Sequence, residues 1–248
     1  MYKTVDFLGL KIGALTADEM IEKIMEFALG GKNKMMAYLN AHCINISFQD
    51  SEYRNILRNS DLVYAGGKGI VWASRLFKEA LPQRVNILDF FDRLAVELSS
   101  RNIGIYLLGG KSDVIKNAAA RLKRPPFNLR ILGFHHGFFD KEEEASIVRE
   151  INMLHPDILM VGLGVPKQEK WISAHLDELN VNLCWAVGAA FEWLSGLRKK
   201  APCRMIMCGF EWLYRLFQEP ARLWKRYLIG NIIFIYHVLV WRIRQGFR

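Results

Sequence analysis

Short apolar runs alternate with longer stretches of helical periodicity along most of the chain. The apolar runs predict a hairpin-like edge at 4–12 and strands at 35–39, 61–65, 103–108, 129–132, 158–161 and 181–187. The helical periodicity predicts helices from a Thr16–Glu19 capping box to Gly30 and at 44–59, 70–78, 88–98, 112–122 (capped by Ser112), 141–154 and 191–194. This alternation predicts an α/β, Rossmann-like fold, in which a parallel sheet carries helices on both faces.

Glycine-rich turns follow three of the predicted strands, at 66–69, 109–110 and 162–164. In open α/β sheets, ligands bind beyond the carboxyl ends of the strands, and the carboxyl ends of parallel strands lie at the same edge. We therefore expect the three turns to surround one crevice.

The stretch 157–171 (DILMVGLGVPKQEKW) combines a buried strand, a glycine turn and a helix that starts with Pro166. The free N–H groups and partial positive charge of such a helix start suit a phosphate group. Alternatively, Gly162 and Gly164 only let the strand and the helix pack closely. The turn lacks the third glycine of a dinucleotide-binding fingerprint, and no acidic residue follows at the usual distance, so we expect no nicotinamide cofactor.

The end of the chain differs in charge from the rest. Residues 197–248 contain eleven Lys or Arg and two acidic residues. The whole chain has 34 basic and 25 acidic residues, which leaves 23 of each sign in residues 1–196. The excess of +9 therefore lies in the last segment, and we divide the chain into an α/β domain at 1–196 and a basic helical C-terminal appendage at 197–248.

The appendage is predicted to be helical at 202–217, again from Pro220, and through a fifteen-residue apolar run at 227–241. A membrane-spanning helix needs about 20 apolar residues, so this run is too short and too polar to cross a bilayer. Trp and Tyr residues alternate with Arg and Lys along the segment, a mixture that suits an anionic membrane surface. The alternative is a helical cap on the sheet whose cations are only solvated.

Composition excludes several other classes. Half of the residues are hydrophobic, which excludes a disordered chain. The four cysteines form no CxxC pair and no metal-ligand spacing, and residues 1–13 do not resemble a signal peptide, so we expect a reduced, cytoplasmic protein. A nucleic-acid-binding role would explain the charge, but no nucleic-acid motif is present, and we expect no nucleic-acid partner.

Eight segments spread over nearly the whole chain carry a resemblance to a known family. They are LNAHCINI (39–46), SDLVYAGGKGIVWASRL (60–76), RVNILDFF (84–91), YLLGGKSDV (106–114), GFF (137–139), VGLGVPKQEKW (161–171), VGAAFEWLSG (187–196) and GFEWLYRLFQEPARLWKR (209–226). Together, and in this order, they resemble the bacterial WecG/TagA/CpsF family, glycosyltransferase family 26.

The resemblance implies an inverting, metal-independent glycosyltransferase that needs no cofactor. Such an enzyme moves a sugar from a UDP-sugar donor to a polyprenyl-diphosphate-linked acceptor in surface or exopolysaccharide biosynthesis. The donor would be UDP-N-acetylmannosamine or another UDP-hexose. The resemblance also implies that the appendage docks peripherally on the inner face of the cytoplasmic membrane, whereas a homo-oligomer is left open.

One matching segment corresponds to the family's GxGxPKQE loop, which lines the nucleotide-sugar pocket. The resemblance therefore places Gly162, Gly164, Lys167, Gln168 and Glu169 at the donor. Gln168 or Glu169 can hydrogen-bond hydroxyl groups of the sugar or ribose. Otherwise, Lys167 and Glu169 are ordinary solvated residues of a first helical turn.

Further donor contacts follow from other segments. Glu192 stands where the family usually has Asp, in a segment near the uridine. Phe139 matches an aromatic residue beside the uracil ring, although it is explained equally well as part of the core. The glycine loops at Gly67, Gly69 and Gly110 would hold the diphosphate.

Four matching residues, together with His42, are expected to act in the reaction itself. Arg215 and Arg222 match appendage arginines that close over the pyrophosphate, where two guanidinium groups would stabilise the departing UDP without a metal. Asn40 matches a strand-end Asn on the acceptor side. Asp89 matches the Asp that follows the RV pair, and it is explained equally well as a carboxylate at the start of a helix.

One departure concerns the family's (P/A)DGxG loop, whose Asp is the proposed general base for the acceptor hydroxyl. Here Gly66 occupies the Asp position. General-base catalysis is typically worth about 10²–10⁴-fold in rate, so its loss needs an explanation. His42 or Asp89 could replace the base, or the acceptor could be activated differently. Alternatively, the chain is a catalytically impaired scaffold that binds a nucleotide sugar within a polysaccharide-assembly complex.

Overall fold

The computed structural model describes residues 2–31, 33–77, 80–198 and 201–246. Within them, eight strands form one sheet in the order β1-β2-β4-β3-β8-β7-β5-β6. β1 and β2 form the predicted antiparallel hairpin, and the other neighbouring strands are parallel, which confirms the Rossmann-like α/β fold. The strands are β1 (Thr4–Phe7), β2 (Leu10–Gly13), β3 (Lys34–Leu39), β4 (Leu62–Ala65), β5 (Gly104–Gly109), β6 (Arg130–His135), β7 (Ile158–Gly162) and β8 (Leu183–Ala186).

Helices cover both faces of the sheet. In β7, Ile158 and Met160 enter one hydrophobic core, whereas Leu159 and Val161 enter another. A strand buried on both faces has a continuous apolar sequence, as predicted for this stretch. On one face lie α1 (Ala17–Leu29), α5 (Ile87–Ser100), α6 (Ser112–Leu122) and α9 (Ala190–Leu194), and on the other lie α2 (Ala41–Gln49), α3 (Ser51–Asn59), α4 (Lys68–Ser74), α7 (Lys141–Leu154) and α8 (Lys167–His175).

Two helices that periodicity predicted as continuous are divided. The segment 44–59 breaks at Asp50, whose carboxylate accepts a hydrogen bond from the Tyr53 N–H and so starts α3. The segment 202–217 breaks at Gly209, which adopts a φ of +78°. This left-handed conformation favours glycine and separates two short helices.

Other helix ends are closer to the prediction. Thr16 and Glu19 form the predicted capping box of α1. Ser112 is the first residue of α6 and Lys111 is its N-cap, so the predicted cap at Ser112 is wrong by one position. α4 ends at Ser74, and the predicted helix end at Lys78 lies outside the described residues.

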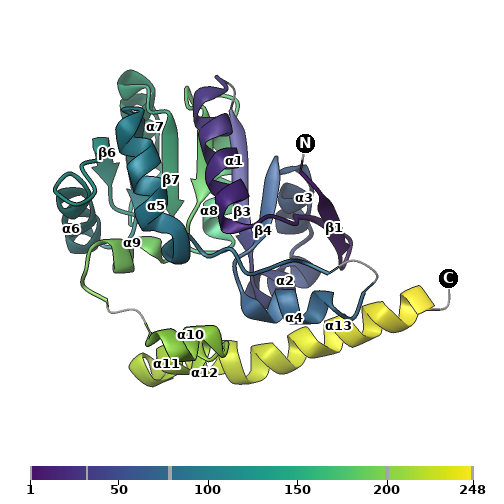
Figure 1. Ribbon diagram of the computed structural model, residues 1–248. Helices are drawn as coiled ribbons and strands as arrows, with labels where there is room; N and C mark the ends of the chain where they lie inside the picture. The colour runs from purple at the N-terminus through teal and green to yellow at the C-terminus, as the bar shows by residue number, and fades with distance from the viewer. Residues whose placement is uncertain (1, 32, 78–79, 199–200, 247–248) are drawn as a thin grey trace.

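The appendage crosses one end of the α/β body, in green to yellow in Figure 1. It contains α10 (Cys203–Met207), α11 (Glu211–Gln218), α12 (Pro220–Trp224), a π-helical turn (Lys225–Ile229) and α13 (Gly230–Gly246). The Asn45 amide of α2 donates a hydrogen bond to the Gly230 carbonyl at 2.7 Å. The Phe48 ring stacks on His237 with ring centres 4.0 Å apart. Together these contacts fix α13 against α2.

Among the described residues, one helical run, Pro220–Arg244, is long and apolar enough to cross a membrane. This run has 25 residues because its helix already begins at Pro220, so by length and composition the prediction that it is too short and too polar to cross a bilayer is wrong. Length and composition do not distinguish a helix that spans a bilayer from one that lies on its surface.

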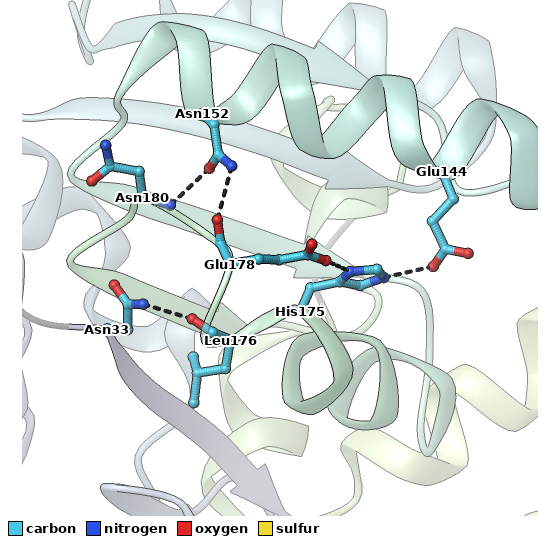
Figure 2. A network of polar contacts seen from close by, with 7 residues as sticks. All are labelled: Asn33, Glu144, Asn152, His175, Leu176, Glu178 and Asn180. Carbon is cyan, nitrogen blue, oxygen red and sulfur yellow. Dashed lines mark hydrogen bonds and ion pairs between the residues drawn. The ribbon is translucent and has the colours of Figure 1, made fainter.

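A polar network joins α7, the end of α8 and the loop before β8 (Figure 2). His175 lies between Glu178 and Glu144, with its Nε2 atom 2.9 Å from Glu144. The Asn152 side chain accepts a hydrogen bond from the Asn180 N–H at 2.7 Å. Burial lowers the pKa of His175, but the two carboxylates outweigh burial and leave the pKa raised. The network therefore anchors α8, whose first turn carries the KQE sequence.

Candidate functional site

A cavity of about 710 Å³ lies between the carboxyl edge of the sheet and the appendage. Its lining includes Asn40, His42, Gly66, Gly67, Gly69, Arg84, Gly164 and Gly188 from the body, and Arg215, Arg222, Arg226, Phe234 and Ile235 from the appendage. Because β3, β4, β7 and β8 are parallel neighbours, the turns that follow them lie at one edge. The appendage folds over that same edge.

Tyr38 fills the space between two of the turns. A Cβ atom on Gly188, which has a φ of +60°, would lie 2.3 Å from the Tyr38 hydroxyl oxygen. A Cβ atom on Gly66 would lie 3.1 Å from the Tyr38 ring. An Asp at position 66 would therefore crowd the ring, so this chain places an aromatic side chain beside the position where the family has a carboxylate.

Arg84 links the body to the appendage. Its side chain, which is only 8% exposed, forms ion pairs of 2.5 Å with Asp89 of α5 and with Glu211 of α11. Arg84 and Glu211 both line the cavity. The ion pair between them therefore closes the cavity wall across the boundary between the body and the appendage.

Arg198 forms a second link between the two parts. It pairs with Glu192 of α9 at 2.5 Å and with Glu219, which lies between α11 and α12. Glu219 also pairs with Arg222 in the cavity wall. Arg198 does not itself line the cavity, but through Glu219 it is connected to an arginine that does.

Two other arginines present unpaired donors. The Nε atoms of Arg215 and Arg226 are buried and have no hydrogen-bond partner among the described residues. The Arg215 guanidinium also lies 5.7 Å from the ring centre of Trp193. A buried charged donor without a partner is costly, so an anion in the cavity would satisfy both side chains.

The charge of the cavity supports the same conclusion. Among the described residues that line the cavity, five are cationic and one, Glu211, is acidic. The cationic residues are Lys68, Arg84, Arg215, Arg222 and Arg226. A cavity with this excess of positive charge is suited to a diphosphate or another multiply charged anion.

Of the two candidate bases, His42 lies in the cavity and Asp89 does not. His42 is half-buried, and burial together with the positive charge of Arg226 lowers its pKa to about 4. Its imidazole is therefore neutral at pH 7 and can accept a proton. Asp89 forms the ion pair with Arg84 outside the cavity lining.

Asn40 lines the cavity and also caps α2, since its side-chain oxygen accepts a hydrogen bond from the Cys43 N–H at 3.1 Å.

Gln168 and Glu169 lie beneath the cavity, fully buried, rather than in its lining. The Gly188 N–H donates to Gln168 Oε1 at 3.0 Å, and Gln168 Nε2 donates to Glu169 Oε1 at 2.8 Å. Burial raises the pKa of Glu169 to about 7, and its Oε2 atom has no hydrogen-bond partner among the described residues. In this structure the pair supports the Gly188 turn, so the expected contacts with sugar or ribose hydroxyls would require a rearrangement.

Five other expected donor residues lie at the same sheet edge but outside the cavity lining. The Gly110 N–H donates to the Gly162 carbonyl at 3.3 Å, so the turns after β5 and β7 are in contact. Exposed Lys167 has its Nζ atom 5.3 Å from the ring centre of half-buried Phe139. The carboxylate of Glu192 is held by Arg198.

The structure thus brings Asn40, His42, Gly67, Gly69, Gly164, Arg215 and Arg222 to one cavity. Sequence reasoning did not identify Tyr38, Arg84, Arg198 and Arg226. Arg84 and Arg226 both lie within segments that resemble the family, RVNILDFF and the segment ending in LWKR, and their charge was the available signal. Tyr38 and Arg198 lie outside those segments, and only the fold places them beside the site.

Comparison with known proteins agrees with the resemblance. The model of the glycosyl transferase WecG/TagA/CpsF family matches residues 5–248. Two similar proteins, from Staphylococcus aureus strains MW2 and NCTC 8325 / PS 47, are named N-acetylglucosaminyldiphosphoundecaprenol N-acetyl-beta-D-mannosaminyltransferase. Each is 29% identical to this chain over 240 residues, which cover 94% of this chain and 91% of the relative.

Proposed function

The chain belongs to the WecG/TagA/CpsF family of glycosyl transferases, and from this we propose that it transfers a hexose from a UDP-sugar to a polyprenyl-diphosphate-linked acceptor. The relatives from S. aureus, whose names specify an N-acetylmannosaminyl donor group and a diphosphoundecaprenol acceptor, support this substrate class. Surface-polysaccharide synthesis is the process in which such an acceptor is extended.

The observation that carries the proposal is the cationic cavity at the carboxyl edge of the sheet. Donor and acceptor each contain a diphosphate, and transfer leaves UDP with additional negative charge. Arg215 and Arg226 have unused buried donors, and Arg222 lies in the same wall. Guanidinium groups held in place before the reaction stabilise the departing diphosphate without reorganising.

We assign His42 as the base. Among the described lining residues, His42 has a neutral imidazole, and Glu211, the one carboxylate, is paired with Arg84. As the acceptor oxygen attacks the anomeric carbon, His42 would take the hydroxyl proton while the bond between that carbon and UDP breaks. This direct displacement inverts the anomeric configuration.

Among the described residues, no group of three or more His, Cys, Asp or Glu side chains could hold a metal ion. The metal-independent reaction remains a prediction.

Gly66 favours a second candidate, a scaffold that binds a nucleotide sugar without transferring it. The chain lacks the carboxylate that the family's loop supplies, and Tyr38 crowds the space beside position 66. If the chain is an enzyme, it releases UDP from a UDP-sugar when the acceptor is also present. If it is a scaffold, it binds UDP but releases no UDP from any UDP-sugar.

The outer surface of the appendage supports a peripheral position on the inner face of the cytoplasmic membrane. Large apolar side chains are exposed along it, at Phe217, Leu228, Ile229, Ile232, Tyr236 and Ile243. Lys225, Arg242 and Arg244 alternate with them and are also exposed. Apolar side chains that enter the headgroup region and cations that meet anionic lipids are the two components of surface binding.

The test is a UDP-release assay in detergent with a panel of UDP-hexoses and a prenyl diphosphate-linked N-acetylglucosamine acceptor. We expect acceptor-dependent release with at least one donor, and a loss of about 10²-fold in Arg222→Gln, because a stabilising charge is removed from the transition state. Arg242→Gln is the matched control, since Arg242 is exposed in the same appendage and outside the cavity. UDP binding without release from any donor would favour the scaffold.

A further inference from the structure

The cavity has an apolar end that the sugar and the diphosphates do not explain. Here α4 and the turn after it contribute Trp72, Ala73 and Leu76, and α13 contributes Phe234, Ile235, Val238 and Leu239. We call this part of the cavity the α4–α13 groove. Neither a UDP-sugar nor an acceptor sugar needs an apolar surface of this size.

The walls of the α4–α13 groove leave apolar surface uncovered. Trp72 is 48% exposed, Leu76 50%, Ile235 54% and Leu239 51%. Trp72 and Leu76 are four residues apart, and so are Ile235 and Leu239. In α13 this i, i+4 spacing places both side chains on one side of the helix. Phe234 and Val238, which are 6% and 3% exposed, belong to the core and form the base of the groove. Uncovered apolar surface within a cavity indicates an apolar ligand.

The groove is continuous with the cationic part of the cavity. A Cβ atom on Gly69 would lie 3.8 Å from the Phe234 ring, so the glycine loop meets α13 at the junction. Arg226 and Leu239 lie on one helical run and both line the cavity. Their thirteen-residue separation corresponds to about 20 Å at 1.5 Å per residue. A ligand that fills both ends is therefore charged at one end and apolar along its length.

We propose that the α4–α13 groove binds the first isoprene units of the acceptor's polyprenyl chain while the neighbouring arginines bind its diphosphate. This inference rests on the proposed function and adds to it a binding site for the lipid. The occupant is one molecule with both chemistries, because the anion site and the apolar groove are parts of one cavity. The outer apolar residues of α13, such as Ile232, lie outside that cavity and remain available to the bilayer.

The test compares two isoleucines of α13. Ile235→Gln places a polar group in the groove, and Ile232→Gln makes the same substitution on the same helix outside it. Both variants are assayed in detergent with two N-acetylglucosaminyl diphosphate acceptors, one carrying a farnesyl chain and one a methyl group. In Ile235→Gln, we expect KM for the farnesyl acceptor to rise about fivefold, because an apolar contact is lost, and KM for the methyl acceptor to stay unchanged.

Ile232→Gln should leave both KM values unchanged. An equal change of KM for both acceptors in Ile235→Gln, or the same change in Ile232→Gln, would overturn the proposal. UDP binding and the melting temperature of each variant show whether the fold is intact. If Ile235→Gln fails to fold, Leu76→Gln makes the same test from the opposite wall.

A readout that does not need turnover separates this inference from the proposed function. A prenyl diphosphate with a photoreactive group on its third isoprene unit is cross-linked to the wild-type protein, and the labelled peptides are identified by mass spectrometry. Labels on Trp72, Leu76, Ile235 or Leu239, which line the groove, support it even if no donor is ever transferred, whereas labels on Ile232 or Tyr236 report only contact with the outer surface of α13. Transfer accompanied by labels only at other positions would confirm the enzyme and refute the groove.

Discussion

Replacing His42 with asparagine removes the proposed base and keeps a polar side chain of similar size. General-base catalysis contributes about 10²–10⁴-fold in rate, so kcat should fall by about that factor. KM for either substrate should change by no more than about threefold, because the lost interaction acts in the transition state. A fall in kcat and kcat/KM by the same factor is therefore the expected pattern.

The pH dependence gives a more specific prediction. Burial and Arg226 lower the pKa of His42 to about 4, so the free enzyme loses its base only as the pH falls toward 4. A diphosphate bound beside Arg226 offsets part of the arginine's charge, which raises the imidazole pKa in the complex. The acid limb of kcat, which reports the complex, should therefore lie at higher pH than that of kcat/KM, which reports the free enzyme.

Initial rates of UDP release across the pH range measure both limbs. In His42→Asn, both acid limbs should disappear from the residual activity, while UDP binding and the melting temperature stay as in the wild type. Adding Gly66→Asp to His42→Asn tests whether a carboxylate can replace the imidazole. We expect rescue only with Tyr38→Ala as well, because the Tyr38 ring lies 3.1 Å from a Cβ atom at position 66. A kcat within twofold of wild type in His42→Asn would refute the assignment.

Three further predictions concern ion pairs and the membrane. Arg84→Met leaves the partly buried Glu211 carboxylate and the exposed Asp89 carboxylate unpaired, so calorimetry should show a stability loss of about 1–2 kcal/mol and a Tm lower by about 3–6 °C. An unchanged Tm would contradict this. The raised pKa of His175 (Figure 2) stabilises the fold below about pH 6.5, and this contribution is lost as the pH rises through the folded-state pKa. In His175→Gln, the free energy of unfolding, measured with urea, should lack this pH dependence. A pH dependence identical to that of the wild type would refute the network's role. Lys225→Glu with Arg242→Glu should reduce sedimentation with anionic liposomes and leave activity on a soluble acceptor intact, whereas undiminished sedimentation would argue against surface binding.

Local sequence signals predicted the fold well because they depend on neighbouring residues. The apolar run at 158–161 is a strand buried on both faces, and the Thr16 capping box starts α1 as expected. The break at Asp50 was missed because the residues on either side continue the helical pattern, whereas Asp50 itself adopts an extended backbone and caps α3 by accepting the Tyr53 N–H. Periodicity detects apolar helix faces. It does not detect a single carboxylate that accepts a hydrogen bond from a backbone N–H group and so interrupts the helix.

The site was predictable only in part, because long-range pairing decides it. The glycine turns and the appendage arginines carry signals of their own, and the structure gathers many of them at one cavity. Arg84 and Glu211 are 127 residues apart, and no local pattern connects them. Gln168 is polar and near a predicted phosphate site, yet its side chain turns inward to hold the Gly188 N–H. Burial of a polar residue depends on the partner that the fold supplies.

The positions of these ion pairs indicate that the site belongs to the body and the appendage together. Arg84 of the body pairs with Glu211 of the appendage in the cavity wall, and Arg198 pairs with Glu192 of the body and with Glu219, which in turn pairs with Arg222 of the wall. Phe234 and Val238 of α13 also complete one of the two hydrophobic cores. Residues 1–196 are neutral overall, so the cavity takes most of its positive charge from the segment that closes it. A diphosphate in the cavity would contact Arg84 from one part and Arg215, Arg222 and Arg226 from the other, so its binding should stabilise the packing of the two parts against each other.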